Sequence, residues 1–145
     1  MQIGYTGVWD AGYVQGVLWN SIGQDEAMAA CANMYKSSAV VDSHLMYDTE
    51  YDRALQWLID TGNKTMDDIV TDSTDWGNYD NSDFPGALVG YSGLINTGST
   101  EYTKANNIYD LAGNLFEWTQ SNARGGSYNR DGDSFPAGRS GRKQN

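Results

Sequence analysis

The stretch that most constrains this chain is 107–118, NIYDLAGNLFEW, which is followed by RGGSY at 124–128. Two acidic side chains, Asp110 and Glu117, stand on either side of a Gly-Asn pair, and such pairs are typical of tight turns. Hard cations take several oxygen ligands, which carboxylates and the backbone carbonyls around a glycine supply within a short loop. The stretch therefore predicts a loop built around an ion, or a turn of similar shape.

These residues resemble the motifs of the formylglycine-generating-enzyme-like (FGE-sulfatase) domains, a branch of the C-type-lectin fold. The family's first motif is matched at Tyr109, Asp110, Leu111, Gly113, Asn114, Glu117, Trp118, Arg124, Gly125, Gly126, Ser127 and Tyr128, with Phe116 where Trp is usual. A second segment, LMYDTEYD at 45–52, resembles the family's Leu-Pro-Thr-Glu-x-Glu-Trp-Glu without its Pro and with Tyr for Trp. The matches follow the family's order over roughly residues 24 to 139.

The resemblance implies an α+β chain with a C-type-lectin-like fold, in which two helices flank short, twisted antiparallel strands and much of the chain is irregular loop. A length of 145 residues is typical of one domain, so we expect a single domain over 1–145. Family members usually continue to a closing strand, but residues 129–145 are polar and show no hydrophobic alternation. We expect that strand to be lacking, and an unpaired edge would then favour an oligomer.

Hydrophobic spacing predicts two helices. The first covers about 24–35, with Ala27, Cys31 and Met34 on one face and the segment 21–24 as its capping pair. The second begins at Asp48 or Thr49 and ends before Gly62, and 66–70 adds one more turn.

Short strands are expected at 39–41, 108–111, 115–118 and 123–128, with one or two more within residues 1–20. Residues 71–106 are rich in Asp, Asn, Ser, Thr and Gly, which predicts a long loop, and loops of this length are usually functional or held by a ligand. The side chains expected to hold it are Trp76, Tyr79, Phe84, Leu88, Tyr91 and Ile95.

Nine basic residues against nineteen acidic ones give a net charge of -10. This balance argues against a nucleic-acid partner, whose phosphates favour Lys and Arg, and it favours solubility and cation binding. No apolar run approaches the ~20 residues of a membrane span, and no signal peptide is expected from the first residues. The single Cys excludes an internal disulfide and leaves the compartment open. We expect a soluble protein, and a virion or cell surface is compatible with the resemblance.

In the resembled family, a structural calcium ion is bound by the residues that match Asp110 and Glu117, together with the backbone carbonyls of those that match Gly113 and Leu115. All four positions are compatible with such a site here. The alternative is that Asp110 and Glu117 only cap turns or pair with Arg124. In either case the expected role is structural.

Copper-dependent family members oxidise a substrate cysteine with two cysteines placed just after the Arg-Gly-Gly-Ser motif. Residues 128–139 contain no cysteine, so neither copper nor this oxidase chemistry is expected, because Cu(I) needs thiolate ligands. Cys31 is expected to be a buried, inert thiol on a helix face. His44 is the only histidine and is expected to be a surface or structural residue. We therefore predict that the chain is not an enzyme.

The segment after Ser127 has the composition of an adaptable recognition surface, since Tyr supplies contact area and Asn, Ser, Asp and Arg supply hydrogen bonds. It also resembles the hypervariable region of diversity-generating-retroelement variable proteins, which share this fold and in which adenine-directed mutagenesis produces such residues. The expected ligand-binding residues are Trp118, Tyr128, Asn129, Arg130, Asp131, Asp133, Ser134, Phe135 and Arg139.

The sequence thus favours a non-catalytic binding module that presents these loops to a protein or glycan on a cell or particle surface, as in a phage tail or a bacterial surface display. Two alternatives stay open. One is a formylglycine-generating-type or other enzyme with altered chemistry, and the other is a structural domain of a larger assembly.

Overall fold

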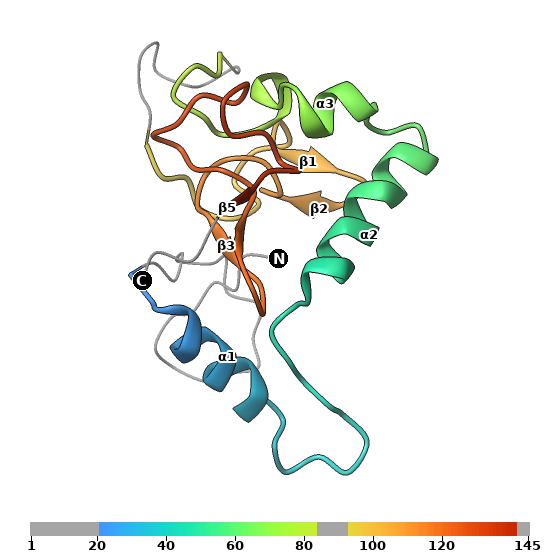
Figure 1. Ribbon diagram of the computed structural model, residues 1–145, viewed down its shortest axis with the longest axis vertical. Helices are drawn as coiled ribbons and strands as arrows, with labels where there is room; N and C mark the ends of the chain where they lie inside the picture. Colours follow the sequence, from blue (N-terminus) through green and yellow to red (C-terminus); the bar gives the residue numbers. More distant parts are fainter. Residues whose placement is uncertain (1–20, 84–92, 142–145) are drawn as a thin grey trace.

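The computed structural model describes residues 21–83 and 93–141. Within these ranges the chain is α+β, with three α-helices and two small antiparallel sheets (Figure 1). The helices are α1 (Gln24–Asn33), α2 (Asp48–Asp60) and α3 (Met66–Val70), followed by a 3-10 turn, η1 (Thr74–Trp76). None of the described helices is long and apolar enough to cross a membrane.

The strands are only two residues long. β1 (Lys104–Ala105) pairs antiparallel with β2 (Ile108–Tyr109), and Asn106 and Asn107 between them have φ values of 47° and 65°. Positive φ at both positions is what a two-residue type I′ hairpin requires, and asparagine tolerates it. The second sheet has the order β3 (Glu117–Trp118), β4 (Ala123–Arg124), β5 (Ser140–Gly141).

The predicted helices are confirmed, with different details at their first turns. Gly23 precedes α1, and its N–H donates to the Glu26 carboxylate at 3.0 Å, so the predicted capping pair at 21–24 is wrong. Helix α2 begins at Asp48 as predicted, and the N–H of Tyr47 donates to the Glu50 carboxylate at 2.8 Å. Beyond the end of α2, Gly62 has a φ of 70°, as expected for a residue that terminates a helix.

The strand predictions are confirmed in part. Strands β2, β3 and β4 lie within the predicted ranges 108–111, 115–118 and 123–128 but are shorter. The predicted strand at 39–41 is wrong, because Val40 is 92 % exposed and none of the described strands pairs with this segment. A β-branched pair favours a strand only on a packed surface. β1, which lies at the end of the predicted loop 71–106, and β5 were not predicted. The strands expected within 1–20 lie outside the described residues.

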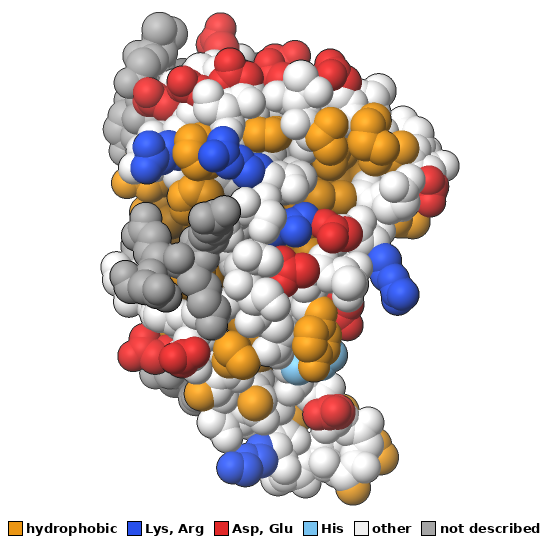
Figure 2. Space-filling model, viewed as in Figure 1, with side chains coloured by type: hydrophobic (Ala, Val, Ile, Leu, Met, Phe, Trp, Pro, Cys, Tyr) orange, Lys and Arg blue, Asp and Glu red, His pale blue; other side chains and the backbone are white. Residues whose placement is uncertain are grey.

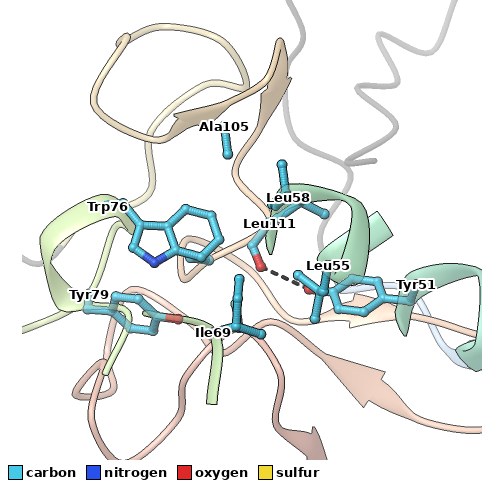
Figure 3. Packing of buried hydrophobic residues seen from close by; sticks show 10 residues of the cluster. Tyr51, Leu55, Leu58, Ile69, Trp76, Tyr79, Ala105 and Leu111 are labelled. Atoms are coloured by element: carbon cyan, nitrogen blue, oxygen red, sulfur yellow. Dashed lines mark hydrogen bonds between the residues drawn. The ribbon is translucent and has the colours of Figure 1, made fainter. Parts of the chain in front are cut away.

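The main core lies between α2, α3, η1 and the loop that precedes β3 (Figure 3). From α2, Tyr51, Leu55 and Leu58 face inward at helical spacing, as predicted. The Tyr51 hydroxyl donates to the carbonyl of Leu111 at 2.8 Å, so a polar group enters the core with its hydrogen bond satisfied. The buried members are Tyr51, Leu55, Leu58, Ile69, Trp76, Tyr79, Ala105, Leu111, Ala112 and Ala137.

A separate cluster covers the inner face of α1, where Ala27 and Cys31 pack with Leu45 and with the ring of Trp118. The predicted face of this helix is thereby confirmed for Ala27 and Cys31, whereas Met34 is only half-buried. Figure 1 shows α1 lying apart from α2 and α3, with the hairpin of β3 and β4 reaching toward it.

The long segment 71–106 is held by polar contacts as well as by aromatic residues. Trp76 and Tyr79 are buried as predicted, whereas Phe84, Leu88 and Tyr91 lie outside the described residues. The buried amide of Asn78 donates to the Asn114 side chain at 3.0 Å and to the carbonyl of Gly93 at 2.8 Å. A side chain of one segment thus satisfies the backbone of another, which fixes a loop that has no sheet of its own.

The acidic residues of this segment face solvent. Asp72, Asp75, Asp80 and Asp83 are all exposed. Figure 2 shows Asp and Glu side chains gathered along one end of the face that it presents. An acidic edge of this kind favours solubility and repels polyanions.

We predict that Gly113→Ala destabilises the protein far more than Gly62→Ala. Both glycines have φ near 70°, but a Cβ at Gly113 would lie 2.2 Å from the carbonyl oxygen of Asn78, whereas one at Gly62 meets nothing within 4 Å. Gly62→Ala should lower the free energy of unfolding by about 1–2 kcal/mol through backbone strain alone. Gly113→Ala should add about 1–3 kcal/mol of overpacking, measured by urea unfolding. Equal losses of unfolding free energy in the two variants would show that the backbone of Asn78 does not pack tightly against Gly113.

Candidate functional site

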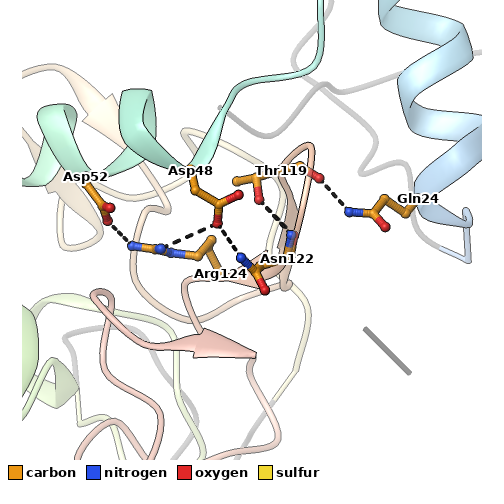
Figure 4. Close-up of polar contacts among 6 residues, drawn as sticks. All are labelled: Gln24, Asp48, Asp52, Thr119, Asn122 and Arg124. Atoms are coloured by element: carbon orange, nitrogen blue, oxygen red, sulfur yellow. Dashed lines mark hydrogen bonds and ion pairs between the residues drawn. The ribbon is translucent and has the colours of Figure 1, made fainter. Parts of the chain in front are cut away.

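A buried arginine joins the second sheet to α2. Arg124 on β4 is 5 % exposed and forms ion pairs with Asp48, at 3.6 Å, and with Asp52 (Figure 4). Its guanidinium also lies 4.8 Å from the centre of the Tyr51 ring. The ion pairs of Arg124 are therefore with α2, so the alternative in which it pairs with Asp110 or Glu117 is not what the structure shows.

The turn between β3 and β4 extends this contact to α1. Asn122 donates to Asp48 at 2.8 Å, and Gln24 at the start of α1 donates to the carbonyl of Thr119 at 2.8 Å. Burial opposes ionisation of Asp48, but hydrogen bonds from Asn122 and Thr119 and the charge of Arg124 outweigh it, and the Asp48 pKa lies below its ordinary value. In Figure 4 these contacts form one polar network between α1 and α2. We call it the polar frame, and its members are Gln24, Asp48, Asp52, Thr119, Asn122 and Arg124.

Two glycines directly after Arg124 turn the chain out of the sheet. Gly125 and Gly126 have φ values of 86° and 75°, which glycine adopts without strain. A Cβ at Gly126 would lie 2.4 Å from the carbonyl oxygen of Phe135, so the chain crosses itself closely here. The Gly-Gly step of the motif therefore sets where the following loop begins.

The loop at 128–139 is fixed to the core through its backbone. The N–H of Tyr128 donates to the carbonyl of Asn114 at 2.9 Å, and the carbonyl of Arg130 accepts from Asp80 at 2.9 Å. Further along, the N–H of Ala137 donates to the Ser73 hydroxyl at 2.9 Å and that of Gly138 to the carbonyl of Ile69 at 2.8 Å. These bonds hold the loop against α3 and η1, and the side chains of 129–131, 133, 134 and 139 face solvent.

The structure brings most of the predicted binding residues together on this loop. Tyr128 and Phe135 are half-buried, and the exposed members are Asn129, Arg130, Asp131, Asp133, Ser134 and Arg139. Within the loop the Ser127 hydroxyl donates to the Asn129 side chain at 2.8 Å, and Arg139 donates to the carbonyl of Ser134.

Phe135 is the centre of the exposed part of the loop. The guanidinium groups of Arg130 and Arg139 lie 5.1 Å and 4.0 Å from the centre of its ring. Phe116 meets the same ring edge-on, with the two ring centres 6.1 Å apart. In the sequence alone, Phe116 stands out only as a departure from the family motif. Its place just before the buried Glu117 could have indicated an outward side chain, because neighbours on a strand alternate.

Trp118 is not part of this group. It packs against α1, and its indole N–H donates to the carbonyl of Ile22 at 2.9 Å. The structure thus gives it a role in holding the first helix, away from Phe135.

Trp118 also lines a cavity of about 400 Å³ beside α1. In it, a ring nitrogen of His44 lies 3.1 Å from the Glu50 carboxylate, a contact that fits the expected surface role of His44. Burial raises the pKa of the Cys31 thiol, which confirms the expected buried cysteine and disfavours its nucleophilic thiolate form. The cavity is lined by Cys31, His44, Leu45, Met46, Glu50, Tyr51, Glu117, Trp118 and Thr119.

The residues proposed for calcium fit a hard cation in their chemistry. Asp110 is 1 % exposed, and its carboxylate oxygens lie near the Thr103 side chain and the Gly98 backbone but make no hydrogen bond of normal geometry with the described residues. Burial raises the pKa values of both Asp110 and Glu117. A buried carboxylate without hydrogen bonds is costly, and a cation would offset this. Within 21–83 and 93–141, however, no three His, Cys, Asp or Glu side chains come together. The remaining ligands would therefore be carbonyls such as those proposed at Gly113 and Leu115.

We predict that Arg124→Met lowers the free energy of unfolding by about 3 kcal/mol, because it leaves the largely buried Asp48 carboxylate without its cation. Asp52→Asn is the matched control. The Asp52 side chain is 59 % exposed, so its loss should cost less than about 1 kcal/mol. Chemical denaturation of both variants measures the difference. If Arg124→Met costs no more than Asp52→Asn, the polar frame does not depend on the arginine.

We predict that calcium raises the melting temperature and that Asp110→Asn abolishes this response. A ligand at about a hundred times its dissociation constant stabilises a native state by about 2.7 kcal/mol. Differential scanning calorimetry in millimolar calcium and in chelator measures the effect, with the exposed Asp67→Asn as control. Identical melts of the unsubstituted chain in calcium and chelator would rule the site out.

The chain matches no model of a known protein family, no curated protein and no solved structure. What it does is therefore inferred from its own motifs and from the geometry of the 128–139 loop.

Proposed function

We propose that this chain is a formylglycine-generating-enzyme-like domain of the C-type-lectin fold that works as a non-catalytic binding module. The 128–139 loop is its recognition surface, and the ligand is a protein or glycan on a cell or particle surface. The proposal is supported by the motifs around 109–118 and 124–128 and by the exposed side chains that follow them.

The observation that supports the proposal most directly is that the backbone and the side chains of the loop have different roles. Backbone groups make the contacts with the core, as for Tyr128, Arg130 and Gly138, while the side chains of Asn129, Asp131 and Asp133 reach solvent. A loop held in this way keeps its shape when its exposed side chains change. Such a rigid support with adaptable polar and aromatic groups is what a recognition surface needs.

This difference between backbone and side chains also supports a more specific proposal. In it, the chain is a diversity-generating-retroelement variable protein of a phage tail or a bacterial surface. Adenine-directed mutagenesis would change the exposed positions without unfolding the domain. Buried positions of the loop do not allow this freedom, because Ala137 is fully buried and a Cβ at Gly132 would lie 2.5 Å from the Thr74 side chain.

The enzyme alternative has less support. The copper chemistry of the family needs a cysteine pair after the Arg-Gly-Gly-Ser motif, and residues 128–139 contain no cysteine. Cys31 lies on α1, a different element from the loop.

Deep sequencing of codons 120–145 across a population of the source tests the proposal. We predict substitutions at the exposed positions Asn129, Arg130, Asp131, Asp133, Ser134 and Arg139, with Gly125, Gly126, Gly132 and Ala137 fixed. Overpacking at the fixed positions would destabilise the fold by about 1–3 kcal/mol each, whereas exposed substitutions stay within about 0.5 kcal/mol. A uniform sequence would contradict the variable version and favour a fixed partner or a structural domain. Variation that is as frequent at Gly132 and Ala137 would contradict the rigid-loop argument.

A further inference from the structure

Two arginines converge on one aromatic ring of the 128–139 loop. The guanidinium groups of Arg130 and Arg139 lie 5.1 Å and 4.0 Å from the centre of the Phe135 ring, and both arginines are exposed. On the face shown in Figure 2, Lys and Arg side chains lie directly beside hydrophobic ones, below the acidic edge.

Neither arginine is neutralised by a carboxylate within the described ranges. The ion pairs found there involve His44, Lys104 and Arg124. This is unexpected in a chain with a net charge of -10, and Asp131 and Asp133 are near in sequence but do not pair with either arginine. Arg139 donates one hydrogen bond, to the carbonyl of Ser134. Most of the N–H donors of the two groups therefore have no acceptor among residues 21–83 and 93–141.

Contact with the ring also restricts the two guanidinium groups. Where a guanidinium lies face-on over an aromatic ring, the N–H groups along its edge stay available for a planar, bidentate acceptor such as a carboxylate. The ring restricts the long side chains, which lowers the entropy that binding would cost. Phe116 is 41 % exposed and extends the apolar surface next to this pair.

We propose that Phe116, Arg130, Phe135 and Arg139 form a subsite for an Asp or Glu side chain of a protein partner, flanked in that partner by an apolar residue. The inference rests on the proposed function, since it names the chemistry that this loop recognises. The carboxylate accepts hydrogen bonds from the free N–H groups of Arg130 and Arg139, and the apolar neighbour covers the exposed ring of Phe116.

The surroundings favour an isolated carboxylate over a polyanion. The exposed Asp131 and Asp133, together with the net charge, repel nucleic acids and sulfated chains. Arg and aromatic residues placed side by side are the groups that dominate binding energy in protein interfaces. A protein segment supplies both the single acid and the apolar contact.

The test is a selection of random peptides displayed on phage, with the full chain as bait. The enriched peptides are expected to share an Asp or Glu next to an apolar residue. Replacing that acid by its amide, or using the bait Arg130→Gln/Arg139→Gln, should weaken binding at least about fivefold, as expected for interface residues that cost more than 1 kcal/mol.

Two further bait variants distinguish the effect of positive charge on binding from the effect of the planar guanidinium geometry. Lys36→Gln/Arg53→Gln removes the same charge from exposed positions outside the loop and should leave binding unchanged. Arg130→Lys/Arg139→Lys keeps the charge but loses the planar fork, and it should bind nearly as weakly as the Gln variant. Unchanged melting temperatures would show that the exposed substitutions leave the fold intact.

The outcomes also separate this inference from the proposed function. Enriched peptides without an acid that lose binding with Asn129→Ala/Ser134→Ala would overturn the carboxylate subsite and keep the loop as a binding surface. Peptides that are indifferent to every substitution in 128–139 would overturn both. Recovery of no peptide, together with arginine-dependent binding of a uronic-acid oligosaccharide, would replace the protein partner by a glycan.

Discussion

The buried guanidinium of Arg124 fixes the relation between the second sheet and α2, and most of the remaining structure depends on it. Each strand has only two residues, so backbone ladders provide few hydrogen bonds between the elements. Side chains make the connection in their place, from Arg124 to Asp48 and Asp52 and from the neighbouring turn to α1. Because a charge taken out of water must be paired, this contact tolerates little displacement of β4.

The position of this arginine explains why the following loop can serve as a surface. It stands directly before Gly125 and Gly126, whose positive φ values turn the chain out of the sheet at a fixed point. From there the backbone of 128–139 is bonded to Asn114, to Asp80 and finally to Ile69, so its shape is set by the core. Apart from buried positions such as Ala137, its side chains contribute little to the core, and they are therefore available for recognition.

The distribution of charge around the 128–139 loop favours an acidic ligand group at one position. Most carboxylates of the 71–83 segment face solvent and leave an acidic edge, while Arg130 and Arg139 are held over Phe135 without an acidic partner in the described ranges. Positive groups close to a half-buried aromatic ring within an acidic molecule form a local contrast in charge, which steers a complementary acid to one place. The proposed subsite follows from this contrast and from the planar geometry of the guanidinium groups.

The sequence by itself determined the elements whose signals lie within a few residues. Helical spacing and the terminating Gly62 located α2, and the Gly-Gly step after Arg124 indicated a turn that only glycine adopts easily. Tertiary structure decided what pairs with what. It placed Trp118 beside α1, paired Arg124 with α2, joined Phe116 to Phe135, added β5 and left 39–41 without a strand. Periodicity, capping and φ preference act locally, whereas these partners are brought together only when the whole chain has packed, and the calcium site and the ligand stay predictions of the motif.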